Sequence, residues 1–91
     1  MNDFISVVIP SYNRFDYLKN AVNSVENQTY KNFEIIVVND NSDDERYYKN
    51  NLSENTKIIH AENKDKKHDG PGSVRNLGIE TANGNLIAFL D

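Results

Sequence analysis

The feature that most constrains the fold is an alternation of short, β-branched apolar runs with segments of helical periodicity. The apolar runs are residues 4–9, 33–38, 57–61 and 86–90. After the first run, apolar residues recur at helical spacing and predict a helix over 15–28 with one buried face. Strands that alternate with helices form right-handed crossovers, so the pattern predicts an α/β fold in which a parallel sheet lies between two layers of helices.

Two further helices are expected. The weaker one is predicted over 44–51, where either Ser42 or Asp43 could cap it. The clearer one begins near Ser73, after a Gly-Pro-Gly break, and contains Gly78. A glycine inside a helix costs about 1 kcal/mol relative to alanine, so Gly78 predicts a close contact between this helix and the sheet.

Length and charge restrict the classes of function. Ninety-one residues form a single domain, 1–91, and a net charge of −4 gives no basic surface for nucleic acid or anionic lipid. No cysteine is present, which excludes a thiolate nucleophile and a Cys-ligated zinc. Apolar runs of about five residues are far shorter than the roughly 20 needed to span a bilayer. We therefore expect no nucleic-acid partner, no transmembrane segment, and a cytoplasmic or membrane-peripheral location.

The run at 86–90 is apolar enough to predict a central, buried strand. Ligands bind at the carboxyl ends of such strands in open α/β sheets, and the sequence stops there, at Asp91. We therefore expect the 91 residues to be the amino-terminal part of a longer protein.

Polar clusters follow three of the apolar runs. They are Ser11-Tyr12-Asn13, Asn39-Asp40-Asn41 and Asp91. In a parallel sheet these positions lie at the same edge, where an aromatic ring, carboxylates and amides suit a nucleotide with its bound metal.

With these motifs the chain resembles the family 2 glycosyltransferases, which have the A-type glycosyltransferase fold. The matching segments are Ile5 to Arg14, Ser24-Val25 with Gln28-Thr29-Tyr30, Phe33 to Ser42, Gly70 to Ile79 and Ala88 to Asp91. They cover nearly the whole chain in the family's order and spacing. The resemblance implies the nucleotide-binding half of that fold, a three-layer, Rossmann-like α/β/α parallel sheet.

The resemblance assigns nucleotide contacts to the turn from Pro10 through Ser11 to Tyr12, with Tyr12 stacking on the base. Such stacking contributes about 1 to 3 kcal/mol. It also implies that Asp40 accepts the N3–H of a uracil, whereas Asn39 stands where the family often has another acid. The alternatives are a half-buried turn residue for Tyr12 and a solvated or helix-capping acid for Asp40.

Two further roles follow from the resemblance. Arg75 corresponds to an arginine that faces the nucleotide, where its planar fork suits a diphosphate; a surface ion pair with Glu80 is the alternative. Asp91 matches the first acid of the Asp-x-Asp metal motif, and the partner acid is missing from the chain. Asp91 as a frayed chain end is the alternative.

The implied activity is inverting transfer of a sugar from a nucleotide-diphosphate sugar, with UDP as the expected nucleotide, to an acceptor hydroxyl. A divalent metal, Mn²⁺ or Mg²⁺, is expected in the full-length protein, and the acceptor is a saccharide or a lipid-linked saccharide, as in polysaccharide biosynthesis. No catalytic residue is expected within 1–91, because the base and the acceptor-binding part would follow Asp91. The chain alone is expected to bind nucleotide weakly and to be inactive.

Two other functions are weighed against this one. A noncatalytic nucleotide-binding or regulatory module could keep the same sheet without the chemistry. A nucleotidyltransferase would carry a glycine-rich loop with Arg and Lys after the first strand, where this chain has Ser11 to Arg14. His60 and His68 lack the spacing of metal ligands and are expected to be solvated surface residues.

Overall fold

A parallel four-stranded sheet forms the centre of the molecule. The computed structural model describes residues 3–49, 52–61 and 71–90. The strands are β1 (Ile5–Ser11), β2 (Phe33–Asp40), β3 (Thr56–Ala61) and β4 (Leu86–Phe89), in the order β3-β2-β1-β4. The helices are α1 (Phe15–Glu26), α2 (Arg46–Lys49) and α3 (Pro71–Thr81).

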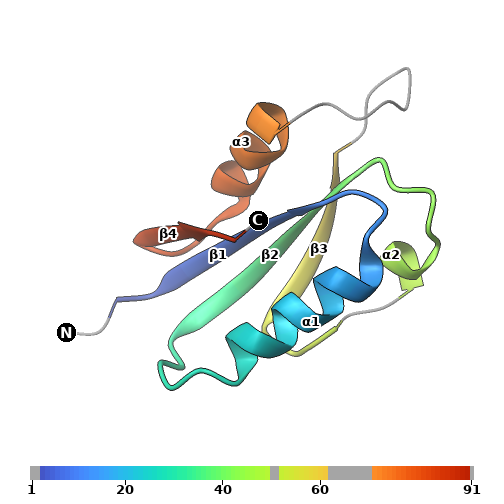
Figure 1. Cartoon of the computed structure of the whole chain (residues 1–91). Coiled ribbons are helices and arrows are strands. Elements are labelled where there is room, and N and C mark those ends of the chain that lie inside the picture. The colour runs from blue at the N-terminus through green and yellow to red at the C-terminus, as the bar shows by residue number, and fades with distance from the viewer. Residues whose placement is uncertain (1–2, 50–51, 62–70, 91) are drawn as a thin grey trace.

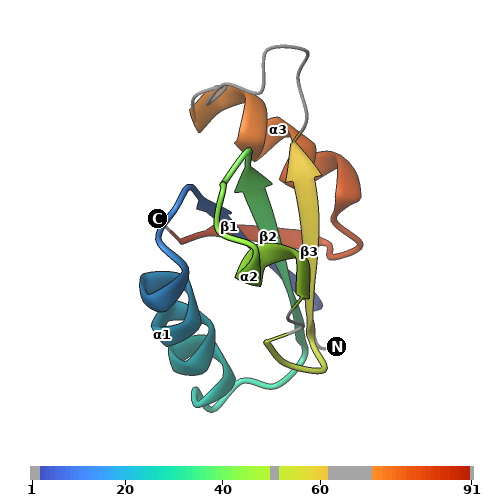
Figure 2. The ribbon, with the colours of Figure 1, turned by 90° about the vertical axis from the view of Figure 1, so that its right-hand side faces the viewer.

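Helices cover both faces of the sheet, as the alternation of strands and helices predicted. On β1, Val7 and Ile9 belong to the apolar cluster that includes Leu18 of α1. Val8, which points to the opposite face, packs with Val74 of α3 instead. Figures 1 and 2 show α1 and α2 on one side of the sheet and α3 on the other. The three-layer α/β/α prediction is confirmed.

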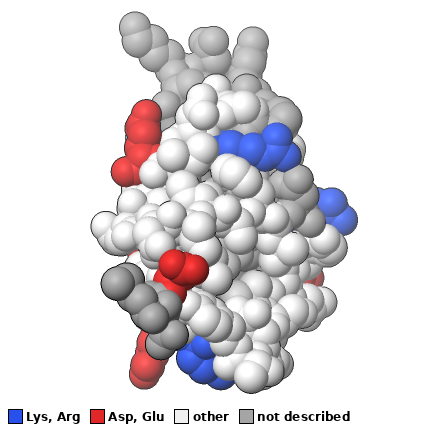
Figure 3. Space-filling model, turned by 90° about the vertical axis from the view of Figure 1, so that its left-hand side faces the viewer, with Lys and Arg blue, Asp and Glu red and all other residues white. Residues whose placement is uncertain are grey.

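The prediction that the fourth strand is central and buried is wrong for the described residues. Among the described strands, β4 pairs with β1 alone and is the last in the sheet order. Its residues Leu86, Ile87 and Phe89 are 46, 39 and 44% exposed. Figure 3, seen from the left of Figure 1, shows a largely uncharged central surface with acidic and basic side chains scattered around it. An apolar composition does not distinguish an edge strand from a central one, because burial also depends on neighbours that the strand itself does not encode.

β1 continues through Pro10 to Ser11, where the sequence suggested an end at Ile9. The carbonyl of Val8 accepts the N–H of Leu90, so the backbone of Val8 faces the β4 side. Alternate residues face the same neighbour, so Pro10 also faces that side, beyond the last residue paired with β4. The missing N–H of proline therefore removes no hydrogen bond from the ladder between β1 and β2.

Gly78 makes the close contact between helix and sheet that its position in α3 predicted. A Cβ atom at Gly78 would lie 2.4 Å from Cγ1 of Val8 and 3.4 Å from Cγ2 of Val38. The absence of a side chain therefore allows α3 to pack directly on β1 and β2.

A polar network fixes the start of β4 against the amino ends of β1 and β2. Oε2 of Glu34 accepts hydrogen bonds from Oγ of Ser6 at 2.6 Å and from the N–H of Asn83 at 2.7 Å. Oγ of Ser6 in turn accepts the N–H of Gly84 at 2.8 Å. Burial raises the pKa of Glu34, but the hydrogen bonds from Ser6 and Asn83 outweigh this effect, and the net pKa lies below the ordinary value.

Candidate functional site

The candidate site lies at the carboxyl edge of the sheet, where the loops after β1 and β2 run side by side (Figure 1). Ser11 at the end of β1 pairs in register with Asn39, which pairs in turn with His60 of β3. The turn that carries Tyr12 and the end of β2 that carries Asp40 therefore lie at the same edge, as the sequence predicted. α3 begins near this edge in both ribbon views (Figures 1 and 2).

Hydrogen bonds join the two loops directly. The N–H of Asn13 donates to Oγ of Ser42 at 2.8 Å, and the N–H of Asp43 donates to Oδ1 of Asn13 at 2.8 Å. Asn13 and Asn41 have positive φ angles of 49° and 62°, a conformation that asparagine tolerates better than most residues. The loops therefore form one connected unit.

The hydrogen bond at the start of α2 is made by Asp44, whereas the sequence predicted Ser42 or Asp43 as the cap. Ser42 bonds to the other loop, and the side chain of Asp44 accepts the N–H of Arg46 at 3.0 Å. Hydrogen bonds from the guanidinium of Arg46 lower the pKa of Asp44. The same guanidinium reaches Asp16 of α1 at 2.8 Å, so α2 is also tied to α1.

Tyr47 of α2 lies beneath the Tyr12 turn and is only 1% exposed. Its hydroxyl is 2.5 Å from Oγ of Ser11 and accepts the N–H of Arg14 at 3.0 Å. Its ring meets Phe15 edge to face, with ring centroids 5.3 Å apart. The sequence gave no sign of the partners of the Tyr47 hydroxyl.

Asp40 is 1% exposed, which excludes the alternative of a solvated turn acid. Its Oδ1 accepts a hydrogen bond from Asn41 Nδ2 at 3.3 Å. Because residues alternate along a strand, Asp40 lies on the α3 side with Val38, whereas Asn39 lies on the α1 side. Tyr12, by contrast, is 42% exposed. The edge therefore combines a buried carboxylate with an accessible aromatic ring.

Asn39 is fully buried, and its side-chain amide bonds to two other residues of the protein. Its Oδ1 accepts the N–H of Ser42 at 3.0 Å, so its amide nitrogen faces Nδ1 of His60, also at 3.0 Å. This assignment of the amide makes Nδ1 of His60 the acceptor and places the imidazole proton on Nε2. The ring of His60 stacks on Tyr48 with centroids 4.5 Å apart. His60 is therefore half-buried and not the fully solvated surface residue that the sequence suggested; His68 lies outside the described residues.

Arg75 lies on α3, the helix that covers the Asp40 side of the sheet. Its guanidinium carbon is 5.9 Å from the centroid of the Phe89 ring on β4. Glu80 follows five residues later, a spacing that places the two side chains on different faces of a helix and argues against the alternative of an ion pair.

The predicted metal ligand, Asp91, lies outside the described residues. Within the described ranges, no three His, Cys, Asp or Glu side chains lie together in a way that could hold a metal ion. The described residues therefore do not by themselves form a metal centre. Among the helices that the structure describes, none is long and apolar enough to span a membrane.

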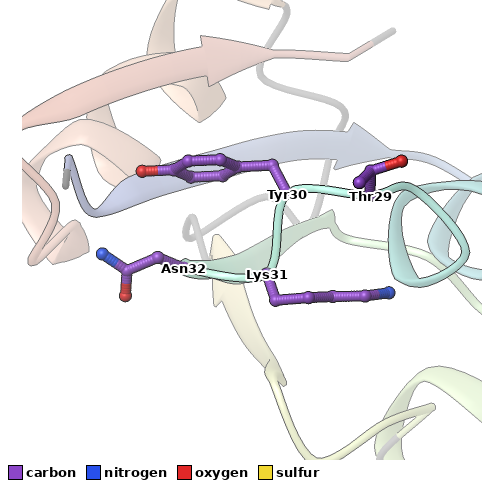
Figure 4. Close-up of a pocket in the computed structure, with 4 residues that line it drawn as sticks. All are labelled: Thr29, Tyr30, Lys31 and Asn32. Carbon is purple, nitrogen blue, oxygen red and sulfur yellow. The ribbon is translucent and has the colours of Figure 1, made fainter.

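Two surface hollows among the described residues are lined by other side chains. One is lined by Thr29, Tyr30, Lys31 and Asn32, ahead of the amino end of β2 (Figure 4). There the Tyr30 hydroxyl and the Asn32 amide both donate to the backbone carbonyl of Asp3. The other is lined by Tyr17, Asn20, Ala21, Ser24 and Leu90, between α1 and the residue that follows β4. Neither hollow contains a carboxylate or histidine, so the carboxyl edge is the better candidate for a site.

The chain is similar to known proteins over nearly its whole length. The model of the family described as glycosyl transferase family 2 matches residues 6–91. An uncharacterized glycosyltransferase of Rickettsia bellii is 43% identical over 91 residues, which are 96% of this chain and 12% of that protein. The chain thus spans about an eighth of the length of this relative.

Two solved structures have the same arrangement of elements. The match to the structure of TarS residues 1–349 from S. aureus covers 97% of this chain and 27% of the TarS chain. Its TM-score is 0.76, and the two sequences are 31% identical. The mannosyltransferase PcManGT from Pyrobaculum calidifontis was solved with GDP-Man and Mn²⁺. The match covers 96% of this chain and 26% of the PcManGT chain. Its TM-score is 0.77 at 17% identity, a likeness that concerns the fold alone.

Proposed function

The chain belongs to glycosyl transferase family 2, and from that premise we propose that it is the donor-binding part of an enzyme that transfers a sugar from a nucleotide-diphosphate sugar. The observation that carries the proposal is the buried Asp40 carboxylate, which shares the carboxyl edge of the sheet with the Tyr12 turn. The Tyr12 ring can stack on the flat face of a base, and the Asp40 carboxylate can accept a hydrogen bond from its edge.

The proposed nucleotide is UDP, because a carboxylate selects for an N–H on the base edge. Uracil presents N3–H as a donor, whereas N3 of cytosine is an acceptor and would meet the Asp40 oxygen with a lone pair. An unmatched polar pair in a buried site costs about 1 to 3 kcal/mol, which corresponds to roughly 5-fold to 150-fold in affinity.

The remaining contacts are assigned to Pro10 and Ser11 beside the base and to Arg75 at the diphosphate. Because Oγ of Ser11 is engaged with Tyr47, the contact that we propose for Ser11 is made by its backbone. The fork of Arg75 can donate two parallel hydrogen bonds to phosphate oxygens, and α3 places this residue on the Asp40 side of the sheet.

We further propose that the complete protein uses a divalent metal, Mn²⁺ or Mg²⁺, with Asp91 as one ligand. Such an ion would neutralise the charge of the diphosphate when bound. The described residues do not form its site, so we assign no step to the ion. Inversion, the catalytic base and the saccharide or lipid-linked acceptor belong to the same proposal and concern residues beyond the described ones.

Calorimetric titration of the chain with UDP and with CDP, each with Mn²⁺ present, tests the base assignment. We expect weak binding of UDP and at least about fivefold weaker binding of CDP. Asp40→Asn should remove most of this preference, because a side-chain amide can satisfy either base edge. Asp43→Asn, which changes an exposed carboxylate in the same loop, should keep it. Equal affinities for UDP and CDP, or no binding at millimolar concentration, would overturn the proposal.

A further inference from the structure

We propose that Tyr47 is a positioning residue for the nucleotide site, in which its single hydroxyl fixes both ends of the turn that carries Tyr12. The inference rests on the proposed function, because it takes this turn to contact the nucleotide. Tyr47 is 1% exposed, so its influence on a ligand must pass through the residues that it holds.

The geometry of the hydroxyl supports this role. It bonds to Oγ of Ser11, directly before Tyr12, and to the N–H of Arg14, two residues after Tyr12. Both partners of one oxygen atom therefore flank the same dipeptide, Tyr12-Asn13. A single contact from α2 thus constrains where β1 ends and where α1 begins.

The start of α1 shows why this external contact is needed. The N-cap residue is Arg14, with φ −138° and ψ 53°, and its side chain makes no capping hydrogen bond. Ser, Thr, Asp or Asn at this position commonly stabilises the first turn from within. Here the ordering contact of the Arg14 backbone comes from Tyr47, a residue 33 positions away.

The apolar core does not require this hydroxyl. The ring of Tyr47 packs in the cluster between α1 and the sheet and contacts Phe15 edge to face, which a phenylalanine could do equally well. Burying a hydroxyl is unfavourable unless it is hydrogen-bonded. The hydrogen bonds that compensate the burial of the Tyr47 hydroxyl go to Ser11 and Arg14 at the two ends of the turn, so its role lies there.

A second set of bonds holds the middle of the turn. Asn13 exchanges hydrogen bonds with Ser42 and Asp43 of the neighbouring loop. Loss of the Tyr47 hydroxyl is therefore expected to loosen the two ends of the turn without detaching it from the β2 loop. Asp40 is not among the partners of Tyr47, so its selection of the base edge should remain.

Tyr47→Phe is the test, and Tyr30→Phe is the matched control. Tyr30 also loses one hydroxyl, which donates to the carbonyl of Asp3 at the amino end of the sheet. Without ligand, we expect the Arg14 amide to exchange with solvent about fivefold faster in Tyr47→Phe and unchanged in Tyr30→Phe. With UDP, we expect about fivefold weaker binding in Tyr47→Phe only, with the preference for UDP over CDP retained.

The two readouts separate this inference from the proposed function. If the unmodified chain binds no UDP, the proposed function fails, and the exchange rate of the Arg14 amide still decides whether Tyr47 holds the turn. Unchanged exchange in Tyr47→Phe overturns the inference, and so does weaker UDP binding that is equally large in Tyr30→Phe. If Tyr47→Phe does not fold, Ser11→Ala removes one partner of the hydroxyl, and unchanged UDP affinity in that variant also overturns the inference.

Discussion

Replacing Gly78 with alanine should destabilise the protein, although alanine is the better helix former. The added Cβ would lie 2.4 Å from Cγ1 of Val8, closer than carbon atoms can approach. Rotating the Val8 side chain is costly, because this β-branched residue is fully buried and its Cγ2 is already 3.3 Å from the same position. Helix propensity favours alanine by about 1 kcal/mol, while overpacking of a core costs about 1 to 3 kcal/mol or more. Because the obstacle is a fully buried, β-branched side chain, we expect the upper part of that range and a net loss of about 2 kcal/mol.

A double-mutant cycle with Val8→Ala isolates the steric part of this loss. Val8→Ala alone should cost about 2 to 3 kcal/mol, because it removes two buried methyl groups and leaves a cavity. In that background the Cβ of Gly78→Ala occupies the vacated space, so the same substitution should become neutral or stabilise the protein by up to about 1 kcal/mol. The expected coupling between the two sites is about 2 to 3 kcal/mol.

Urea unfolding followed by circular dichroism measures these differences, since the chain has no tryptophan. Gly72→Ala, also in α3, is the control: a Cβ there meets no atom within 4 Å, and the substitution should stabilise the protein by about 0.5 to 1 kcal/mol. The reasoning is refuted if Gly78→Ala is as stable as the unmodified chain, or if it costs the same whether residue 8 is valine or alanine.

Two further predictions concern the polar network at the start of β4. Glu34→Gln should cost about 1 to 2 kcal/mol at pH 7, because the carboxylate receives hydrogen bonds from Ser6 and Asn83. The pKa of Glu34 is lower in the folded state, so its contribution is complete above the unfolded pKa, about pH 5 and upward, and is lost as the pH falls through the folded pKa. Urea unfolding at several pH values should show the difference from the unmodified chain shrinking in acid, and a difference independent of pH would contradict the assignment. Gly84→Ala should cost more than about 2 kcal/mol, because its Cβ would lie 2.6 Å from the Phe4 carbonyl oxygen and 2.7 Å from the Ser6 backbone nitrogen, neither of which can rotate away; an unchanged urea midpoint would contradict this.

The sequence predicted the layers of the fold because burial on each face of a strand has a local period. Valines and isoleucines at alternate positions of β1 and β2 point to α1 or α3, and Gly78 indicated where α3 approaches the sheet. The edge position of β4 could not be predicted in this way. Its apolar residues are compatible with either place, and the sheet order is decided by pairings between distant segments.

The side-chain contacts at the candidate site could not be predicted from the sequence for a related reason. The hydroxyl of Tyr47 meets Ser11 across 36 positions of sequence, and Asn39 meets His60 across 21. Such contacts depend on the register of neighbouring strands and on where the short helix α2 packs against them, neither of which has a local signature. A polar residue that is buried and hydrogen-bonded to a residue far away in the sequence cannot be told from a solvated one by its local sequence.

The Asn39-His60 contact also explains why an amide suits the position where the family often has an acid. Asn39 receives one donor, the N–H of Ser42, and faces one ring nitrogen, Nδ1 of His60. An amide supplies one acceptor and one donor group and matches both partners with Nδ1 unprotonated. A carboxylate would offer only acceptors, so it would need the imidazole proton on Nδ1 to satisfy the same pair. Because both ends of the Asn39 side chain are used within the protein, the base contact that we propose at this edge is assigned to its neighbour Asp40.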